Sequence, residues 1–95
     1  MALLTSNEID QALANMPGWE RQGDGIVREF SFDGGFMGSM GFVNRLAAAA
    51  EAVDHHPDLA ISWNRVTVTL STHSAGGITD KDVALAGEAD RLAAG

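Results

Sequence analysis

The apolar residues of this chain recur with two different periods, and the changes of period predict where helices and strands alternate. A spacing of three to four residues is typical of one helix face, whereas alternation at every second residue is typical of a strand. The predicted elements are helix 5–16, strands 19–22 and 26–32, helix 33–56, strands 59–63 and 66–70, and helix 79–92. The order α-β-β-α-β-β-α indicates an α+β fold, a four-stranded antiparallel sheet with three helices packed on one face.

Polar residues mark where the predicted helices begin. Thr5 and Glu8, and again Thr79 and Asp82, have the spacing of a capping box, in which two side chains satisfy free backbone amides of the first turn. Asp33 is the candidate N-cap of the long helix. The apolar stripe expected to pack on the sheet is Phe36, Met40, Val43, Ala47 and Ala50, widened by Phe42 and Leu46.

The second predicted hairpin sets the positions of the three histidines of the chain. If residues 64–65 form a two-residue turn, Trp63 pairs with Val66, and counting outward places His56 opposite His73. The remaining histidine precedes His56 directly, so this register predicts three imidazoles at one end of the hairpin.

Length, composition and charge narrow the class of protein. The 95 residues make one small domain, residues 1–95, for which oligomerisation would supply additional burial. The absence of cysteine excludes a disulfide framework, a thiolate nucleophile and a zinc site with cysteine ligands. The net charge of -7, with six scattered basic residues, disfavours nucleic-acid binding. No signal layout or apolar run long enough for a bilayer is present, so we expect a cytoplasmic protein that does not bind membranes.

Proton transfer is the natural chemistry of a histidine cluster, because imidazole gives or takes a proton near neutral pH. Glu51 lies one helical turn before His55 and could orient or charge its ring. Asp82, at the start of the last helix, is the candidate carboxylate near His73. No Ser, Cys or Lys close to the cluster resembles an activated nucleophile.

Other interpretations of the same residues remain open. Three histidines could bind zinc, but adjacent histidines rarely direct both rings at one ion, and the spacing HExxH is absent. His55 and His56 could instead serve only as positive charges at a helix C-terminus. Trp19 fits a core position, whereas Trp63, between the histidines in sequence, is the better candidate for lining a flat aromatic ligand.

The spacing of these residues resembles the signature of the pterin-4a-carbinolamine dehydratases. The segment Glu51-x-x-x-His55-His56-Pro57 is followed at the family's intervals by Trp63, His73 and Asp82. Nearly the whole chain takes part in the resemblance, through Pro17-Gly18-Trp19, Arg28 to Phe32, Gly41-Phe42 and Leu70-Ser71-Thr72-His73. Leu59, where relatives usually carry an aromatic residue, and Gly34-Gly35 depart from the family pattern.

The resemblance implies an activity and a role for each site residue. Members dehydrate the 4a-hydroxytetrahydropterin made by aromatic amino-acid hydroxylases, without a metal or cofactor, and form dimers or tetramers. By position, His55 and His73 resemble the general acid/base pair, and His56 resembles the pterin-binding histidine. Glu51 and Asp82 resemble the supporting carboxylates. Some relatives act instead as dimerisation or assembly partners, so a non-catalytic binding module of the same fold is the alternative.

Overall fold

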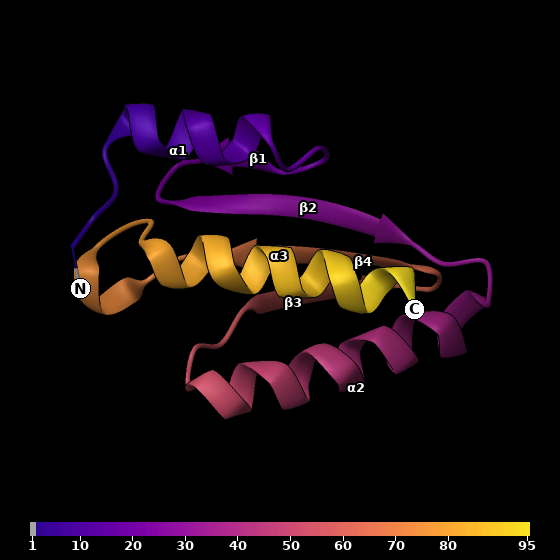
Figure 1. Ribbon diagram of the computed structural model, residues 1–95. Coiled ribbons are helices and arrows are strands. Elements are labelled where there is room, and N and C mark those ends of the chain that lie inside the picture. Colours follow the sequence, from indigo (N-terminus) through magenta and orange to yellow (C-terminus); the bar gives the residue numbers. More distant parts are fainter. Residues whose placement is uncertain (1) are drawn as a thin grey trace.

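A computed structural model describes residues 2–95, and its elements follow the predicted order with one short 3-10 helix added (Figure 1). The elements are α1 (Ser6–Ala14), β1 (Glu20–Gln22), β2 (Gly25–Ser31), α2 (Gly35–Val53), β3 (Asp58–Ser62), β4 (Arg65–Leu70), the 3-10 helix η1 (His73–Ala75) and α3 (Asp80–Ala94). Both predicted capping boxes are present, at Thr5 for α1 and at Thr79 for α3. Within residues 2–95, no helix is long and apolar enough to cross a membrane.

The four strands form one antiparallel sheet in the order β1-β2-β4-β3. In the view of Figure 1, α3 lies across the middle of the sheet, and α1 and α2 lie toward its β1 and β3 edges. The predicted α+β fold class is therefore confirmed. The sheet order leaves β3 as an edge strand, and every residue of β3 is exposed.

The core lies between the sheet and the helices. Aromatic rings contribute much of it, with the rings of Phe30 and Phe42 centred 4.9 Å apart. Arg28, which interrupts the apolar face of β2, is paired: its guanidinium donates to Oδ1 of Asp90 at 2.8 Å, and the indole N–H of Trp19 donates to the same oxygen at 2.9 Å. Strand β2 and the end of α3 are thereby joined. The buried apolar residues are Ile9, Trp19, Ile26, Phe30, Phe42, Leu46, Ala50, Val66, Val68, Leu70, Ile78, Leu85, Ala86 and Ala89.

Helix α2 begins later than predicted, and its buried face matches the predicted stripe only in part. Its N-cap is Gly34 rather than Asp33, and no side chain caps it. Gly35 has a φ of 68°, a conformation that glycine adopts without strain, so the chain turns here before the helix continues. The buried residues of α2 are Ser39, Phe42, Leu46 and Ala50, whereas Phe36 and Ala47 of the predicted stripe are exposed.

The second hairpin is shifted by two residues from the predicted register. Ser62 pairs with Arg65, so the turn is 63–64 and the predicted pairing of Trp63 with Val66 is wrong. Because side chains alternate between faces with a period of two, the shift leaves every residue on its predicted face. The prediction that His56 faces His73 is also wrong, since counting from the pair 58–69 places residue 71 opposite His56.

Contacts from outside the hairpin hold the turn in this register. The hydroxyl of Ser39 on α2 donates to the carbonyl of Trp63 at 2.6 Å, and the N–H of Phe32 donates to the carbonyl of Asn64 at 2.9 Å. Trp63 adopts a φ of 49° in this turn. The register is therefore decided by tertiary contacts that a local turn preference does not include.

Candidate functional site

The end of α2 separates the two adjacent histidines. Asp54 adopts the left-handed conformation, with φ 51° and ψ 44°, and the N–H of His55 then donates to the carbonyl of Ala50 at 3.1 Å. This reversal turns His55 into the interior, where the residue is 8% exposed, and leaves His56 exposed. The two adjacent histidines therefore lie in different environments, His55 buried and His56 exposed.

Asp82 is the buried centre of the site. Its Oδ1 lies 2.6 Å from Nε2 of His55, and its Oδ2 accepts from the Thr72 hydroxyl at 2.8 Å and from the Thr79 N–H at 2.9 Å. The carboxylate is fully buried in the first turn of α3, where the helix dipole favours a negative charge. A carboxylate accepts hydrogen bonds, so Nε2 of His55 carries the hydrogen that is donated to Asp82. The other ring nitrogen, Nδ1, takes no part in this contact.

Thr72 extends this network toward the third histidine. Its hydroxyl also lies 2.8 Å from the Thr79 hydroxyl, and His73 is the next residue in the chain. Asp82 thus fastens the segment that carries His55 to the segment that carries His73. Sequence reasoning singled out Asp82 but not Thr72. The only sequence signal for Thr72 is its place in the segment Leu70-Ser71-Thr72-His73.

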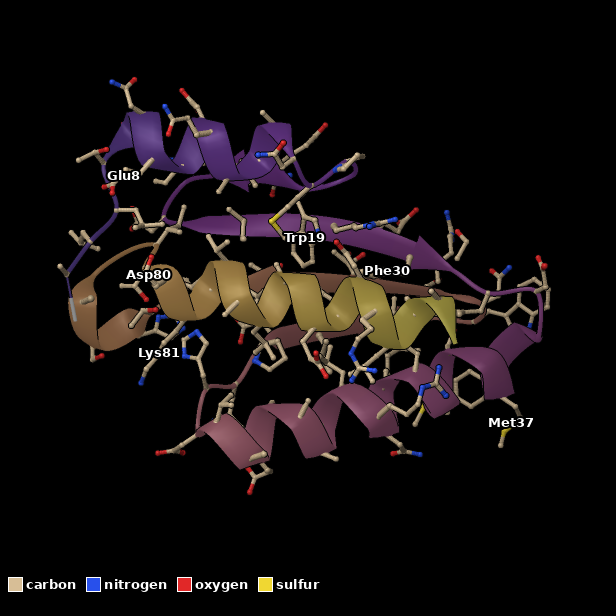
Figure 2. All side chains as sticks on the ribbon, in the orientation of Figure 1. Glu8, Trp19, Phe30, Met37, Asp80 and Lys81 are labelled. Atoms are coloured by element: carbon tan, nitrogen blue, oxygen red, sulfur yellow. The ribbon has the colours of Figure 1, made fainter. Side chains whose placement is uncertain are left out.

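The histidines border two different hollows. His55 borders an apolar groove of about 440 Å³ between α2 and α3, whose other lining residues include Ala52, Lys81 and Leu85. His73 is exposed at the start of η1 and borders a smaller, more polar hollow of about 250 Å³ together with Asp58 and other residues. Within residues 2–95, neither of these two hollows is lined by all three imidazoles. Figure 2 shows Asp80 and Lys81 at the start of α3, the end of the molecule where this network lies.

The carboxylate partners of the histidines differ from the predicted ones. Glu51 contacts His56, with Oε1 and Nε2 2.5 Å apart, and not His55. Asp82 contacts His55 and not His73. The left-handed residue Asp54 explains the exchange, because it ends the helical spacing on which the pairing of Glu51 with His55 depended.

Trp63 lies away from the histidines of its own chain. It is part of the turn between β3 and β4, whereas His56 precedes the opposite end of β3. Five residues of strand separate these ends, a length of roughly 16 Å at about 3.3 Å per residue. In the described part of the chain, residues 2–95, Trp63 lines neither the groove at His55 nor the hollow at His73.

Charged groups along the groove include one ion pair. Glu88 lines the groove and accepts hydrogen bonds from the guanidinium of Arg91 one turn later in α3. These hydrogen bonds hold the pKa of the Glu88 carboxyl below its usual range and raise the pKa of Arg91. In the part of the chain that the structure describes, no three His, Asp or Glu side chains converge as metal ligands.

Comparison with known proteins defines the family. The sequence family described as pterin 4 alpha carbinolamine dehydratase matches residues 2–92. A protein of Mycobacteroides abscessus, provisionally named a pterin-4-alpha-carbinolamine dehydratase, is 57% identical over 86 residues, which cover 90% of each chain. A protein of Thermosynechococcus vestitus with the same name is 53% identical over 90 residues, 95% of this chain and 94% of the relative. The chain therefore belongs to the pterin-4a-carbinolamine dehydratase family.

Solved structures agree with this assignment. A transcriptional coactivator/pterin dehydratase from Brucella melitensis superposes with a TM-score of 0.92 at 38% identity, covering 96% of this chain and 98% of that one. A pterin dehydratase-like protein, described as a RuBisCO assembly factor in the alpha-carboxysome, superposes with a TM-score of 0.64 at 24% identity. That second likeness covers 79% of this chain and 86% of the other, and it shows a shared fold.

Proposed function

We propose that this chain dehydrates 4a-hydroxytetrahydropterins to quinonoid dihydropterin and water, and so recycles the pterin cofactor of aromatic amino-acid hydroxylases. The observation that carries the proposal is the buried Asp82 carboxylate, which joins His55 to the segment preceding His73. Asp82 caps α3 through its contact with the Thr79 N–H, so a purely structural aspartate would need no histidine partner. The contact with His55 is therefore additional to the helix cap, and the His55 ring borders the groove between α2 and α3.

The proposed reaction needs one proton donor and one proton acceptor. The C4a–O bond breaks as the hydroxyl takes a proton and leaves as water, and the N5–H proton is removed as the C4a=N5 double bond forms. His55 and His73 supply these two roles by general acid/base catalysis. Because Nε2 of His55 faces Asp82, Nδ1 is the atom of that ring assigned to the proton transfer.

His56 is assigned to substrate binding. Its ring is about half exposed, with a side-chain exposure of 54%, and Glu51 orients it from α2. An exposed ring held by a carboxylate can donate to acceptor atoms of the pterin without taking part in the proton transfer. The same proposal includes a cytoplasmic homodimer or homotetramer that needs no metal or other cofactor.

A direct assay tests the proposal. Purified protein is mixed with freshly generated 4a-hydroxytetrahydropterin, and formation of the quinonoid product is followed against the uncatalysed rate. The His55→Ala/His73→Ala double variant is the matched control, because it keeps Asp82 and both capping boxes. Equal rates for the native protein and the blank, with circular dichroism showing folded protein, would sink the proposal.

The alternative is a non-catalytic binding or assembly module. The observation in its favour is the concentration of exposed apolar side chains along α2 and β3, which offers a protein-binding surface. Under this alternative the histidine variants would leave the protein's association unchanged, and the native protein would show no turnover in the assay.

A further inference from the structure

Thr72 is a buried polar residue that is connected to both proposed acid/base histidines. It lies between β4 and η1, directly before His73, and is 5% exposed. Its hydroxyl donates to Oδ2 of Asp82 at 2.8 Å, and Oδ1 of the same carboxylate lies 2.6 Å from Nε2 of His55. The side chain of Thr72 therefore reaches one histidine through a single carboxylate, and its backbone continues into the other.

The direction of each hydrogen bond in this network follows from the groups involved. A carboxylate only accepts, so the single hydroxyl hydrogen of Thr72 is committed to Asp82. The contact of 2.8 Å between the hydroxyls of Thr72 and Thr79 is therefore donated by Thr79. The Thr79 oxygen in turn accepts from the N–H of Lys81 in the first turn of α3 (Figure 2). A chain of donors thus runs from α3 through both threonines to Asp82.

The distribution of these donors fixes the orientation of the Asp82 carboxylate. Oδ2 receives the Thr72 hydroxyl and, at 2.9 Å, the Thr79 N–H, so that Oδ1 is left for His55. Two donors on one oxygen restrict the rotation of the carboxylate more than one donor does. The Asp82 side chain is fully buried, so bulk water does not replace a lost donor. Loss of the Thr72 hydroxyl would therefore loosen the group that orients the His55 ring.

The backbone of Thr72 closes the short loop that carries His73. Its N–H donates to the carbonyl of Gly77 at 2.8 Å, and its carbonyl accepts from the N–H groups of Ala75 and Gly76, each at 3.0 Å. Thr72 and Gly77 also pair as a single antiparallel bridge. His73 is thus the first residue of a loop whose two ends are joined at Thr72. A displacement of Thr72 would move His73 with it.

The helix cap does not account for the Thr72 hydroxyl. Thr79 and Asp82 form the capping box of α3 between them. In the part of the chain that the structure describes, no buried side-chain nitrogen or oxygen lacks a hydrogen-bond partner. Thr72→Val would fill nearly the same space, but it would leave the Thr79 hydroxyl without its acceptor and Asp82 with one donor fewer. The hydroxyl therefore serves the arrangement around Asp82 and His55.

We propose that Thr72 is a positioning residue for the proton transfer. Its hydroxyl holds Asp82 in the orientation that fixes the Nε2–H form of His55, and its backbone holds the loop that begins with His73 against the same carboxylate. Thr72 itself touches neither the substrate nor the reacting atoms. The effect on proton transfer rests on the proposed function, whereas the effect on the His55 ring does not.

Nitrogen-15 NMR of the histidine rings tests the positioning without any assay of activity. Long-range correlation spectra separate the Nδ1 and Nε2 signals of a neutral ring and show which nitrogen carries the hydrogen. The chain has three histidines, and His55→Ala identifies the signals of His55 by their loss. We expect the neutral His55 ring to be the Nε2–H form in the native protein and a mixture of both tautomers in Thr72→Val. Unchanged His55 signals in folded Thr72→Val would overturn the proposal.

Matched variants separate the hydroxyl from the shape of the side chain. Thr72→Ser keeps the donor, so we expect the native His55 signals, and altered signals in this variant would contradict a role for the hydroxyl alone. Thr67→Val makes the same chemical change in β4, on the sheet face opposite the buried Val66 and Val68, and should leave His55 unchanged. Thr72→Ala removes the donor without adding a methyl group, and it takes the place of Thr72→Val if circular dichroism shows that the valine variant is unfolded.

Steady-state kinetics tests the link to proton transfer. We expect Thr72→Val to lower kcat roughly tenfold, as for the loss of one hydrogen bond to a charged group, and Thr72→Ser to restore most of it. KM should stay nearly unchanged, because His56 is oriented by a separate contact with Glu51. A raised KM at constant kcat would place the effect in substrate binding and refute the positioning role. If the native protein shows no turnover, the proposed function fails, and the NMR result still decides whether Thr72 positions His55.

Discussion

The Nε2 atom of His55 lies 2.6 Å from Oδ1 of Asp82, and the two residues are 27 positions apart in the chain. The contact joins the end of α2 to the first turn of α3, so one carboxylate both completes a helix cap and fixes an imidazole. The histidine ring is therefore oriented by the same group that determines where α3 begins.

Replacement of Asp82 should damage stability and activity together. Asp82→Asn keeps the shape but turns one accepting oxygen into a donor, so the buried contacts to His55, Thr72 and Thr79 can no longer all be satisfied. We expect a loss of about 1–3 kcal/mol in unfolding free energy and a fall of at least about tenfold in kcat. Urea denaturation and steady-state kinetics measure the two effects. Asp80→Asn, an exposed residue in the same turn, is the control, and equal effects of both variants would contradict the prediction.

The two proposed acid/base histidines should cover for each other in part. His55→Ala and His73→Ala should each retain measurable turnover, and the double variant should be nearly inactive, because each general acid/base group contributes roughly 10²- to 10⁴-fold. Measurements of kcat and KM on all three variants test this, with circular dichroism as the folding control. A double variant with near-native kcat would rule out His55 and His73 as the acid/base pair.

His56 should affect substrate affinity more than turnover. Its proposed role is binding in the ground and transition states alike, so His56→Ala should raise KM and leave kcat nearly unchanged. Glu51→Gln should shift KM in the same direction and by less, because the amide still accepts a hydrogen bond from the ring. The mutant of a neighbouring exposed acid, Asp54→Asn, serves as control. A fall in kcat at constant KM for His56→Ala would move this residue into the proton-transfer step.

Chelation should leave activity unchanged. The proposed reaction uses only proton transfer, and His55 and His56 direct Nε2 at separate carboxylates. Dialysis against a strong chelator, followed by the dehydratase assay and elemental analysis, measures the outcome. Stoichiometric zinc whose removal abolishes turnover and whose return restores it would be incompatible with this chemistry.

The elements could be predicted because their signals are local. Alternation in β3 and β4, and the polar residues at Thr5 and Thr79, act within a few positions of the chain, and all four features are present in the structure. Arg28 illustrates the limit of such local signals, since its charge on the core face of β2 is explained only by Asp90, far away in the chain.

The details of the site depended on contacts that a linear pattern does not contain. The turn at 63–64 is fixed by Ser39 on α2, and the partners of the carboxylates follow from the left-handed residue Asp54. Neither Ser39 nor Asp54 stands at a sequence spacing that differs from that of an ordinary helix or turn. The identities of Asp82 and Glu51 were accessible from sequence, but which histidine each one contacts was not.

The position of Asp82 also has a consequence for the order of events in refolding. Helices and the β3–β4 hairpin close short loops, whereas the contact between His55 and Asp82 closes a loop of 27 residues and needs α3 in place. In an intermediate whose secondary structure has formed but whose α3 has not docked, Asp82 would not yet hold the His55 imidazole in place. Recovery of turnover after dilution from denaturant should therefore lag behind the far-ultraviolet circular dichroism signal, and the lag would time the docking of the last helix.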